Sequence, residues 1–313
     1  MHEPVLTLER VSKKYGNFTA VDNIDLRIPR GSVYGFLGPN GAGKTTTMRM
    51  ILDIIRPSSG SITVLGKSSA LEVRDRIGYL PEEKGLYKKM KVAGLISYFA
   101  SLKGMARKTA DQRAEQLLEQ YGLKDFTNAR IESLSKGMSQ KVQVLAAVAH
   151  EPELVILDEP FSGLDPVNQQ VLEELINNLS NNGQTVIFST HIMEHAERLC
   201  DQILLIAGGK KIFDGSVVEA RALVPRRVLL ETTSDVSGLQ QLESVAGITP
   251  TEDEPGADPR WLVEITNTAH PQDILKYCFD QNIPLNRFEF AEPSLHDVFV
   301  GLVGKEAREQ RLR

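Results

Sequence analysis

The sequence reads GPNGAGKT from Gly38 to Thr45. This stretch fits GxxxxGK[ST], the pattern of a loop whose backbone N–H groups surround phosphate oxygens. An apolar run of strand length precedes it at 32–37, and apolar residues at helical spacing follow it at 45–55. Because a helix N-terminus adds partial positive charge beside such a loop, the stretch predicts a site for a nucleoside triphosphate.

The loop supplies both phosphate contacts and a metal contact. The expected nucleotide-binding residues are Gly38, Pro39, Asn40, Gly41, Ala42, Gly43, Lys44, Thr45 and Thr46. In this pattern the Lys44 ammonium reaches the β- and γ-phosphates, and the Thr45 hydroxyl is a ligand of Mg²⁺. A glycine-rich turn without a ligand is the alternative, but the flanking strand and helix favour the phosphate site.

A second motif, LVILDEP, runs from Leu154 to Pro160. Its apolar residues indicate a buried strand that ends at Asp158 and Glu159. Beside a phosphate loop, Asp158 would hold Mg²⁺, and Glu159 could orient or deprotonate the attacking water. Acidic residues at strand ends also serve as helix caps, which is the structural alternative.

The composition is that of an ordinary soluble globular protein. The 313 residues are 41% hydrophobic and 25% charged, with a formal net charge of −5, so nothing in the charge predicts a nucleic-acid partner. No apolar run approaches the roughly 20 residues that span a bilayer, and the N-terminus lacks the apolar segment of a secretory signal. The two cysteines, Cys200 and Cys278, lack metal-like spacing, and we expect reduced thiols.

Residues 1–222 are expected to form one α/β domain. Short strand-like runs before residue 28 predict antiparallel strands, and later apolar runs alternate with helical patterns, which predicts a parallel sheet with crossover helices. Three segments with helical spacing, 92–102, 109–121 and 139–150, indicate an inserted helical subdomain at about 83–150.

Residues 223–313 are expected to form a small α+β accessory domain without catalytic residues. Strands are predicted at 226–233, 248–252, 261–266 and 284–290, and helices at 236–245, 271–280 and 294–303. Taken in chain order, the elements from 226 to 290 follow the sequence βαββαβ, which is that of a ferredoxin-like split βαβ unit. The middle turn, 251–259, is expected to be polar and exposed.

Together the motifs identify a resemblance to the nucleotide-binding subunits of ATP-binding cassette (ABC) transporters, over about residues 5–215. The resemblance implies a P-loop NTPase cassette that binds ATP with Mg²⁺ and hydrolyses ATP. Tyr15 matches the aromatic residue that stacks on adenine in this family, although a lone tyrosine is more often a packing residue. SGLD at 162–165 matches the loop through which two such subunits touch.

A histidine and a signature sequence extend the resemblance. His191 matches the family's switch histidine, which contacts the γ-phosphate, whereas His195 is expected on the surface. LSKGMSQK at 134–141 is similar to the family signature LSGGQ, with Lys136 and Met138 as departures. The resemblance implies that Ser135 and Gly137 contact the γ-phosphate of ATP held by a second subunit.

Glu82 departs from the family pattern. It follows the strand predicted at 77–81, where the family has a glutamine that is a ligand of Mg²⁺ and senses the membrane partner. A glutamate can still supply an oxygen to Mg²⁺, but it donates no hydrogen bond and adds negative charge. We expect altered hydrolysis or coupling rather than loss of activity.

The resemblance also implies partners. Two cassettes, as a homodimer or heterodimer, would enclose ATP and dock on a separate integral membrane permease, with the helical subdomain as the docking surface. The subunit would then be cytoplasmic and peripheral on the inner face of the membrane. The accessory domain favours export over import. The alternative is a soluble or purely regulatory ABC ATPase that is not coupled to transport.

Overall fold

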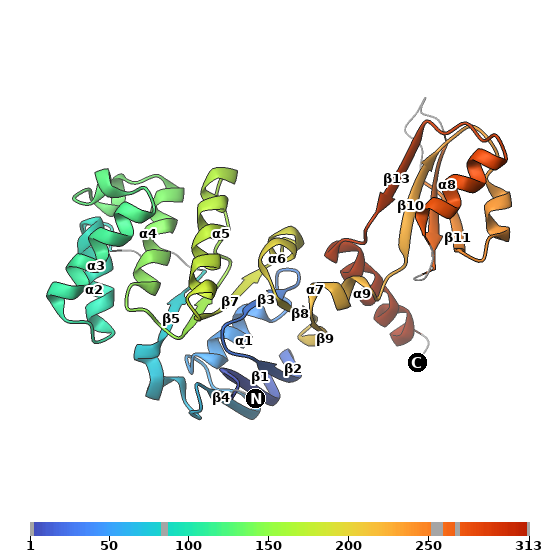
Figure 1. The fold of residues 1–313 in the computed structure, drawn as a ribbon. Coiled ribbons are helices and arrows are strands. Elements are labelled where there is room, and N and C mark those ends of the chain that lie inside the picture. The colour runs from blue at the N-terminus through green and yellow to red at the C-terminus, as the bar shows by residue number, and fades with distance from the viewer. Residues whose placement is uncertain (1–2, 83–86, 252–258, 267–269, 312–313) are drawn as a thin grey trace. The chain divides into compact units, whose positions relative to one another are not determined.

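The computed structural model describes residues 3–82, 87–251, 259–266 and 270–311. The chain divides into two compact units, Met1–Ser216 and Val217–Arg313, which are described separately below (Figure 1). No helix in the described ranges is long and apolar enough to cross a membrane.

The central sheet of the first unit has the strand order β5-β6-β7-β3-β8-β9 within the described residues. Its strands are β3 (Val33–Leu37), β5 (Ile77–Leu80), β6 (Leu154–Leu157), β7 (Thr185–Thr190), β8 (Gln202–Ala207) and β9 (Lys210–Gly215). The pairs from β5 to β8 are parallel, and only β9 runs antiparallel to its neighbour. Every residue of β3, β6 and β7 is buried, as expected for a parallel sheet covered on both faces.

A smaller antiparallel sheet has the order β2-β1-β4. It contains β1 (Leu6–Tyr15), β2 (Phe18–Ile28) and β4 (Ser59–Val64). A two-residue turn at Gly16 and Asn17 joins β1 to β2. The apolar residues of these strands pack with α1 and β3 in one hydrophobic cluster, so the sheet is fixed beside the loop that follows β3.

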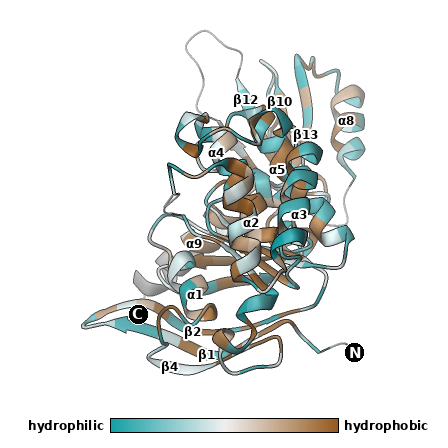
Figure 2. Cartoon of the chain, turned by 90° about the vertical axis from the view of Figure 1, so that its left-hand side faces the viewer, coloured by the Kyte–Doolittle hydropathy of each residue, from teal (hydrophilic) through white to brown (hydrophobic). Residues whose placement is uncertain are grey.

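The helices of this unit follow the predicted periodicity. They are α1 (Lys44–Ile51), α2 (Val92–Leu102), α3 (Arg107–Gln120), α4 (Lys136–Val148), α5 (Pro166–Asn181) and α6 (Met193–Leu199), with 3₁₀ helices η1 (Ala70–Arg76), η2 (Lys124–Phe126) and η3 (Ile131–Ser133). The helical subdomain comprises α2, α3 and α4, and its predicted start lies outside the described residues. In Figure 2, α2 is more hydrophobic than α3, of which only a narrow stripe is buried.

Within its described residues, the second unit contains a four-stranded antiparallel sheet in the order β11-β12-β10-β13. Its elements are α7 (Val217–Arg221), β10 (Arg226–Glu231), η4 (Ser237–Gln241), β11 (Val245–Pro250), β12 (Arg260–Ile265), α8 (Pro271–Asp280), β13 (Arg287–Ala291) and α9 (Leu295–Arg311). This is the strand order of a split βαβ unit.

The structure corrects one predicted helix in this unit. The segment expected as a helix at 236–245 contains only the 3₁₀ helix η4, and β11 already begins at Val245. Gly238 lies within this segment and lowers its helix propensity. Most of the expected polar turn at 251–259 lies outside the described residues.

Candidate nucleotide site

The candidate site lies at the carboxyl edge of the central parallel sheet. The phosphate loop follows β3, Glu82 follows β5, Asp158 and Glu159 follow β6, and His191 follows β7. Carboxyl ends of parallel strands meet at one edge, which is where open α/β sheets bind ligands. The fold therefore brings together residues that are up to 153 positions apart, from Gly38 to His191.

The phosphate loop requires its glycines. Gly38 has φ +152° and Gly43 has φ +108°, and a Cβ at these positions would lie 2.1 Å from the Ile206 carbonyl oxygen and 2.6 Å from the Ala20 carbonyl oxygen. The loop closes on Lys44, whose Nζ donates a 2.7 Å hydrogen bond to the Gly38 carbonyl oxygen. Helix α1 begins at Lys44, so its first N–H groups point into the loop.

Asp158 is a buried carboxylate with one satisfied oxygen. Its Oδ1 accepts hydrogen bonds from Thr45 Oγ1 at 3.1 Å and from Ser189 Oγ at 2.6 Å. Its Oδ2 is buried without a hydrogen-bond partner in the described part of the chain. Burial raises the pKa of Asp158, and the hydrogen bonds from Ser189 and Thr45 oppose that rise.

Glu159 is held between two basic side chains. Its Oε1 lies 3.4 Å from Lys44 Nζ, and its Oε2 lies 3.0 Å from His191 Nδ1. Its backbone N–H donates to Ser189 Oγ at 2.8 Å. Glu159 adopts φ +47°, a left-handed conformation that is uncommon for a non-glycine residue and persists where surrounding contacts fix it.

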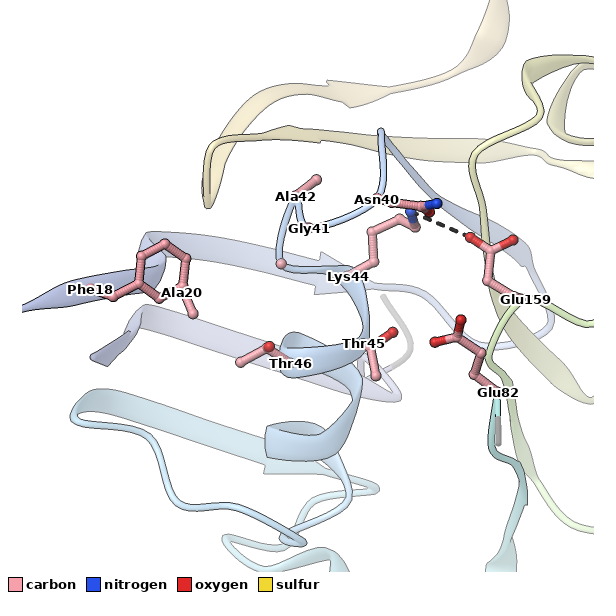
Figure 3. A pocket seen from close by; sticks show the side chains of 11 residues that line it. Phe18, Ala20, Asn40, Gly41, Ala42, Lys44, Thr45, Thr46, Glu82 and Glu159 are labelled. Atoms are coloured by element: carbon pink, nitrogen blue, oxygen red, sulfur yellow. Dashed lines mark ion pairs between the residues drawn. The ribbon is translucent and has the colours of Figure 1, made fainter. Parts of the chain in front are cut away.

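Lys44, Thr45 and Glu159 face an open pocket of about 280 Å³, which Asp158 and His191 do not line (Figure 3). It is lined by Phe18, Ala20, Asn40, Gly41, Ala42, Gly43, Lys44, Thr45, Thr46, Glu82 and Glu159. In Figure 3 the carboxylates of Glu82 and Glu159 lie on the same side of the pocket, beside Lys44 and Thr45. The exposed Glu82 thus faces the phosphate loop, as expected from its place after β5.

Sequence reasoning missed two lining residues, Phe18 and Ala20. Both lie on β2, just after the turn that follows Tyr15, and Phe18 pairs with Tyr15 across that turn. Tyr15 does not line the pocket, and the Lys13 ammonium lies 5.1 Å from its ring centroid. Phe18 is exposed and is a second aromatic platform beside the loop. No local sequence pattern distinguishes Phe18 from a packing residue, because its place beside the loop depends on the path of β2.

Ser135 and Gly137 lie at the start of α4 and do not line this pocket. The Ser135 hydroxyl caps α4 by accepting a 3.2 Å hydrogen bond from the Met138 N–H. Gln140 is buried in the next turn, and its Nε2 donates to the Pro160 carbonyl oxygen at 3.0 Å. The signature helix is therefore joined to the loop that follows Glu159, while Ser135 lies apart from the phosphate loop of its own chain.

His195 contradicts the expectation of a surface residue. It is only 3% exposed, its ring lies 4.2 Å from the Phe161 ring, and its Nδ1 is 3.5 Å from Thr190 Oγ1. Burial lowers its pKa, so the neutral imidazole is favoured. His195 packs against Phe161, which lies in the loop after β6 that carries Glu159.

The donor set suits a cation that also binds phosphate. No group of three histidine, cysteine or acidic side chains that could hold a metal occurs among the described residues. One hydroxyl from Thr45 and one carboxylate from Asp158 fit Mg²⁺, which keeps waters and takes phosphate oxygens as its other ligands.

Family comparisons agree with this geometry. A family model described as ABC transporter matches residues 21–162, and one described as the C-terminal domain of DrrA1-3-like ATP-binding proteins matches residues 215–303. The uncharacterized ABC transporter ATP-binding protein YhaQ of Bacillus subtilis is 42% identical over 301 residues, covering 96% of this chain and 99% of YhaQ. The Nod factor export ATP-binding protein I of Cupriavidus pinatubonensis is 33% identical, covering 97% of this chain and 92% of that protein.

Solved structures agree as well. An ATP-binding subunit of an ABC transporter matches with a TM-score of 0.65 and 30% identity, over 70% of this chain and 92% of that one. CbiO1 of Clostridium perfringens, part of the ABC transporter complex cbiONQ, matches with a TM-score of 0.63 and 26% identity, over 71% and 92%. The P-loop cassette fold expected from the sequence is thus confirmed, and the chain belongs to the ATP-binding, ATP-hydrolysing subunits of ABC transporters.

Proposed function

We propose that this subunit is one half of an ATP-driven dimer that energises export through a separate membrane permease. The observation that carries the proposal is the position of Glu159. The carboxylate stands at the end of β6, between Lys44 and His191 and next to Asp158, on the wall of the nucleotide pocket. Hydrolysis needs a group beside the phosphate loop that accepts a proton from water or positions it, and the place of Glu159 supports that role.

Thr45 and Asp158 would hold Mg²⁺, and Glu82 would contact it through water. The unpartnered Asp158 Oδ2 supports this assignment, because a buried carboxylate oxygen needs a compensating charge or donor. Bound there, the cation would neutralise charge on the phosphate oxygens.

Glu159 is proposed to accept the proton of the attacking water. The Nδ1 atom of His191 holds Glu159 Oε2 in place, and His191 is exposed enough to reach the γ-phosphate. The Lys44 ammonium pairs with Glu159 in the structure. With a triphosphate bound, the same ammonium would also contact the phosphate oxygens. Tyr15 and Phe18 are proposed to contact the adenine, where a flat ring is a suitable platform.

The dimer is proposed because one chain does not complete the site. Ser135 and Gly137 lie away from the phosphate loop of their own chain. A hydroxyl and N–H groups at a helix N-terminus suit a phosphate, and α4 of a second subunit would present them to the first.

Export is supported by the accessory domain and by named relatives. The DrrA1-3-like match covers most of the second unit, to residue 303. Similar proteins include a Nod factor export protein and the linearmycin resistance protein LnrL of Bacillus subtilis, which is 31% identical. We assign residues 1–222 to the ATPase and 223–313 to the accessory domain. The helical subdomain near Glu82 would dock on the permease, at the inner face of the membrane.

The substitution Glu159→Gln tests the proposed base. The variant should bind ATP like the wild type, lose most turnover, and form a stable dimer with ATP that sedimentation velocity detects. Glu151→Gln is the matched control, because Glu151 precedes β6 at the opposite edge of the sheet. Near-normal steady-state hydrolysis by Glu159→Gln would contradict the assignment. Reconstitution with the permease in vesicles would then measure the direction of transport.

A further inference from the structure

The accessory sheet has one face covered by helices and one partly exposed face, called the open face below. Apolar side chains of η4 and α8 cover the first face, where Val228, Leu230, Val263 and Ile265 are at most 1% exposed. Figure 1 shows α8 on this face. The alternate residues of the two central strands, β10 and β12, belong to the open face, since successive side chains of a strand point to opposite faces. These are Arg227, Leu229, Glu231, Arg260, Leu262 and Glu264.

The charges on this open face alternate in sign. Arg227 lies opposite Glu264, with Nη2 and Oε1 3.1 Å apart, and Glu231 lies opposite Arg260, with Oε2 and Nε 3.1 Å apart. Leu229 and Leu262 form the apolar pair between them. The four charged side chains remain between 20% and 36% exposed, so they can meet charges from another surface.

This pattern is complementary to itself. If a second copy of the face lies over the first, with a two-fold axis along the strands between β10 and β12, Arg227 meets Glu264 and Glu231 meets Arg260. Leu229 of one copy then meets Leu262 of the other. Each of these contacts occurs twice in the dimer, once from each copy, as an isologous interface requires. Aligned packing of two sheets brings such side chains together.

The edge strand β13 selects this axis. Glu289 lies beside Leu229 on the open face. A two-fold axis across the strands would place Glu289 over its own copy, with like charges facing each other. The axis along the strands instead places Glu289 over Thr249, which carries no charge.

We propose that the open face of the accessory sheet binds a second copy of this chain, face to face and without nucleotide. The charge pattern argues for a copy rather than an unrelated partner, because the two central strands supply their own complement at all four of their charged positions, while Arg287 and Glu289 on β13 pair with each other within the chain. The contact is distinct from the ATP-driven cassette dimer. It would keep two subunits together between cycles of hydrolysis by raising their effective concentration.

The test uses the full chain without nucleotide, at low ionic strength, in a sedimentation-velocity concentration series. The wild type should self-associate, and salt should weaken the association. Arg227→Glu alone and Glu264→Arg alone each place like charges opposite each other twice per dimer, and each should raise the dissociation constant at least tenfold. An equimolar mixture of the two variants should associate again, since one chain then carries the negative pair and the other the positive pair.

Controls separate association from folding. Each single variant also breaks a pair within its own chain, so circular dichroism melting and ATP affinity are measured on each. The double variant R227E/E264R keeps the internal pair and should self-associate while pairing poorly with the wild type. A wild type that stays monomeric overturns the proposal, and so does a mixture of the two variants that fails to associate. If Arg227→Glu weakens permease binding but leaves self-association unchanged, the proposal is also wrong. The ATP-trapped dimer of Glu159→Gln is measured separately, so either proposal can fail alone.

Discussion

The parallel sheet and the accessory sheet of this protein place their charged residues in opposite ways. In the parallel sheet both faces are buried, and the ionisable side chains collect at the carboxyl edge, where Lys44, Asp158 and Glu159 meet. In the accessory sheet one face is buried, and the charges lie in pairs along the other. The carboxyl edge of the parallel sheet suits a ligand site, because the loops after several strands can bring side chains to one ligand.

The two sheets also differ in how fully their ionisable groups are paired. At the edge of the parallel sheet, Asp158 keeps an oxygen without a partner, and Glu159 is held in a left-handed conformation. On the accessory sheet each of the four facing charges has an ionic partner within its own chain. Buried polar atoms without a hydrogen-bond partner also occur elsewhere, including Arg227 Nε on the accessory sheet, but within the described residues only at Asp158 and Glu159 do they coincide with backbone strain beside a pocket.

The largest expected effect is at the phosphate loop. Lys44→Ala should weaken ATP binding roughly 100-fold, because a charged hydrogen-bond donor to the triphosphate is lost. Isothermal titration calorimetry measures this, with Lys108→Ala on the exposed side of α3 as the control. Equal affinities for Lys44→Ala and the wild type would show that the edge of the parallel sheet is not the nucleotide site.

The two faces of the accessory sheet can be compared directly. Leu230→Ala removes a fully buried side chain and should destabilise this unit by about 2–4 kcal/mol. Leu229→Ala, the neighbour on the open face, should cost clearly less. Calorimetric melting measures both, and ATP affinity should stay unchanged in each. A loss of ATP affinity with Leu230→Ala would show that the second unit contributes to the site.

The sequence predicted the parts of the site that local pattern determines. The loop at 38–45, the strand before Asp158 and the helix at 92–102 follow from spacing and apolar periodicity, because those patterns are local. The convergence of four strand ends follows from a parallel sheet. The family resemblance supplied the roles of Ser135 and His191, which no spacing could indicate.

The missed features depend on contacts between distant segments. Phe18 and Ala20 line the pocket because β2 passes beside the phosphate loop, where Ala20 approaches Gly43. His195 is buried because Phe161, from the loop after β6, stacks on its ring. Neither contact produces a regular spacing of apolar residues in the sequence, so local periodicity could not reveal it.

A smaller effect is expected at the opposite edge of the parallel sheet. His150 Nε2 lies 3.2 Å from the Ile77 carbonyl oxygen, and its Nδ1 is buried without a partner among the described atoms. Burial, with the nearby Lys103 ammonium, lowers the pKa of His150 from 6.5 to about 4. The unfolded chain therefore binds this proton at a higher pH than the folded chain, and stability is lost as the pH falls from 6.5 toward 4.

Removal of the imidazole tests this. Urea unfolding at pH 7 and pH 5 should show about 1 kcal/mol less acid destabilisation in His150→Gln than in the wild type, after allowance for the partial exposure of the ring. Turnover at pH 7 should change little, because this edge carries no reacting group. Identical pH dependence in both chains would show that His150 titrates normally when folded.

The smallest effect is expected at Glu82, the exposed carboxylate on the pocket wall. Glu82→Gln removes one negative charge near the phosphates, and a single exposed charge contributes about 1 kcal/mol or less. Without Mg²⁺ the variant should bind ATP slightly more tightly, since less negative charge faces the triphosphate. With Mg²⁺ this gain should vanish or reverse, because the carboxylate also attracts the cation. Titrations of ATP with and without Mg²⁺ measure both affinities, and Glu72→Gln on η1 is the control. An equal gain under both conditions would show that Glu82 acts only by repelling phosphate and does not contact the metal.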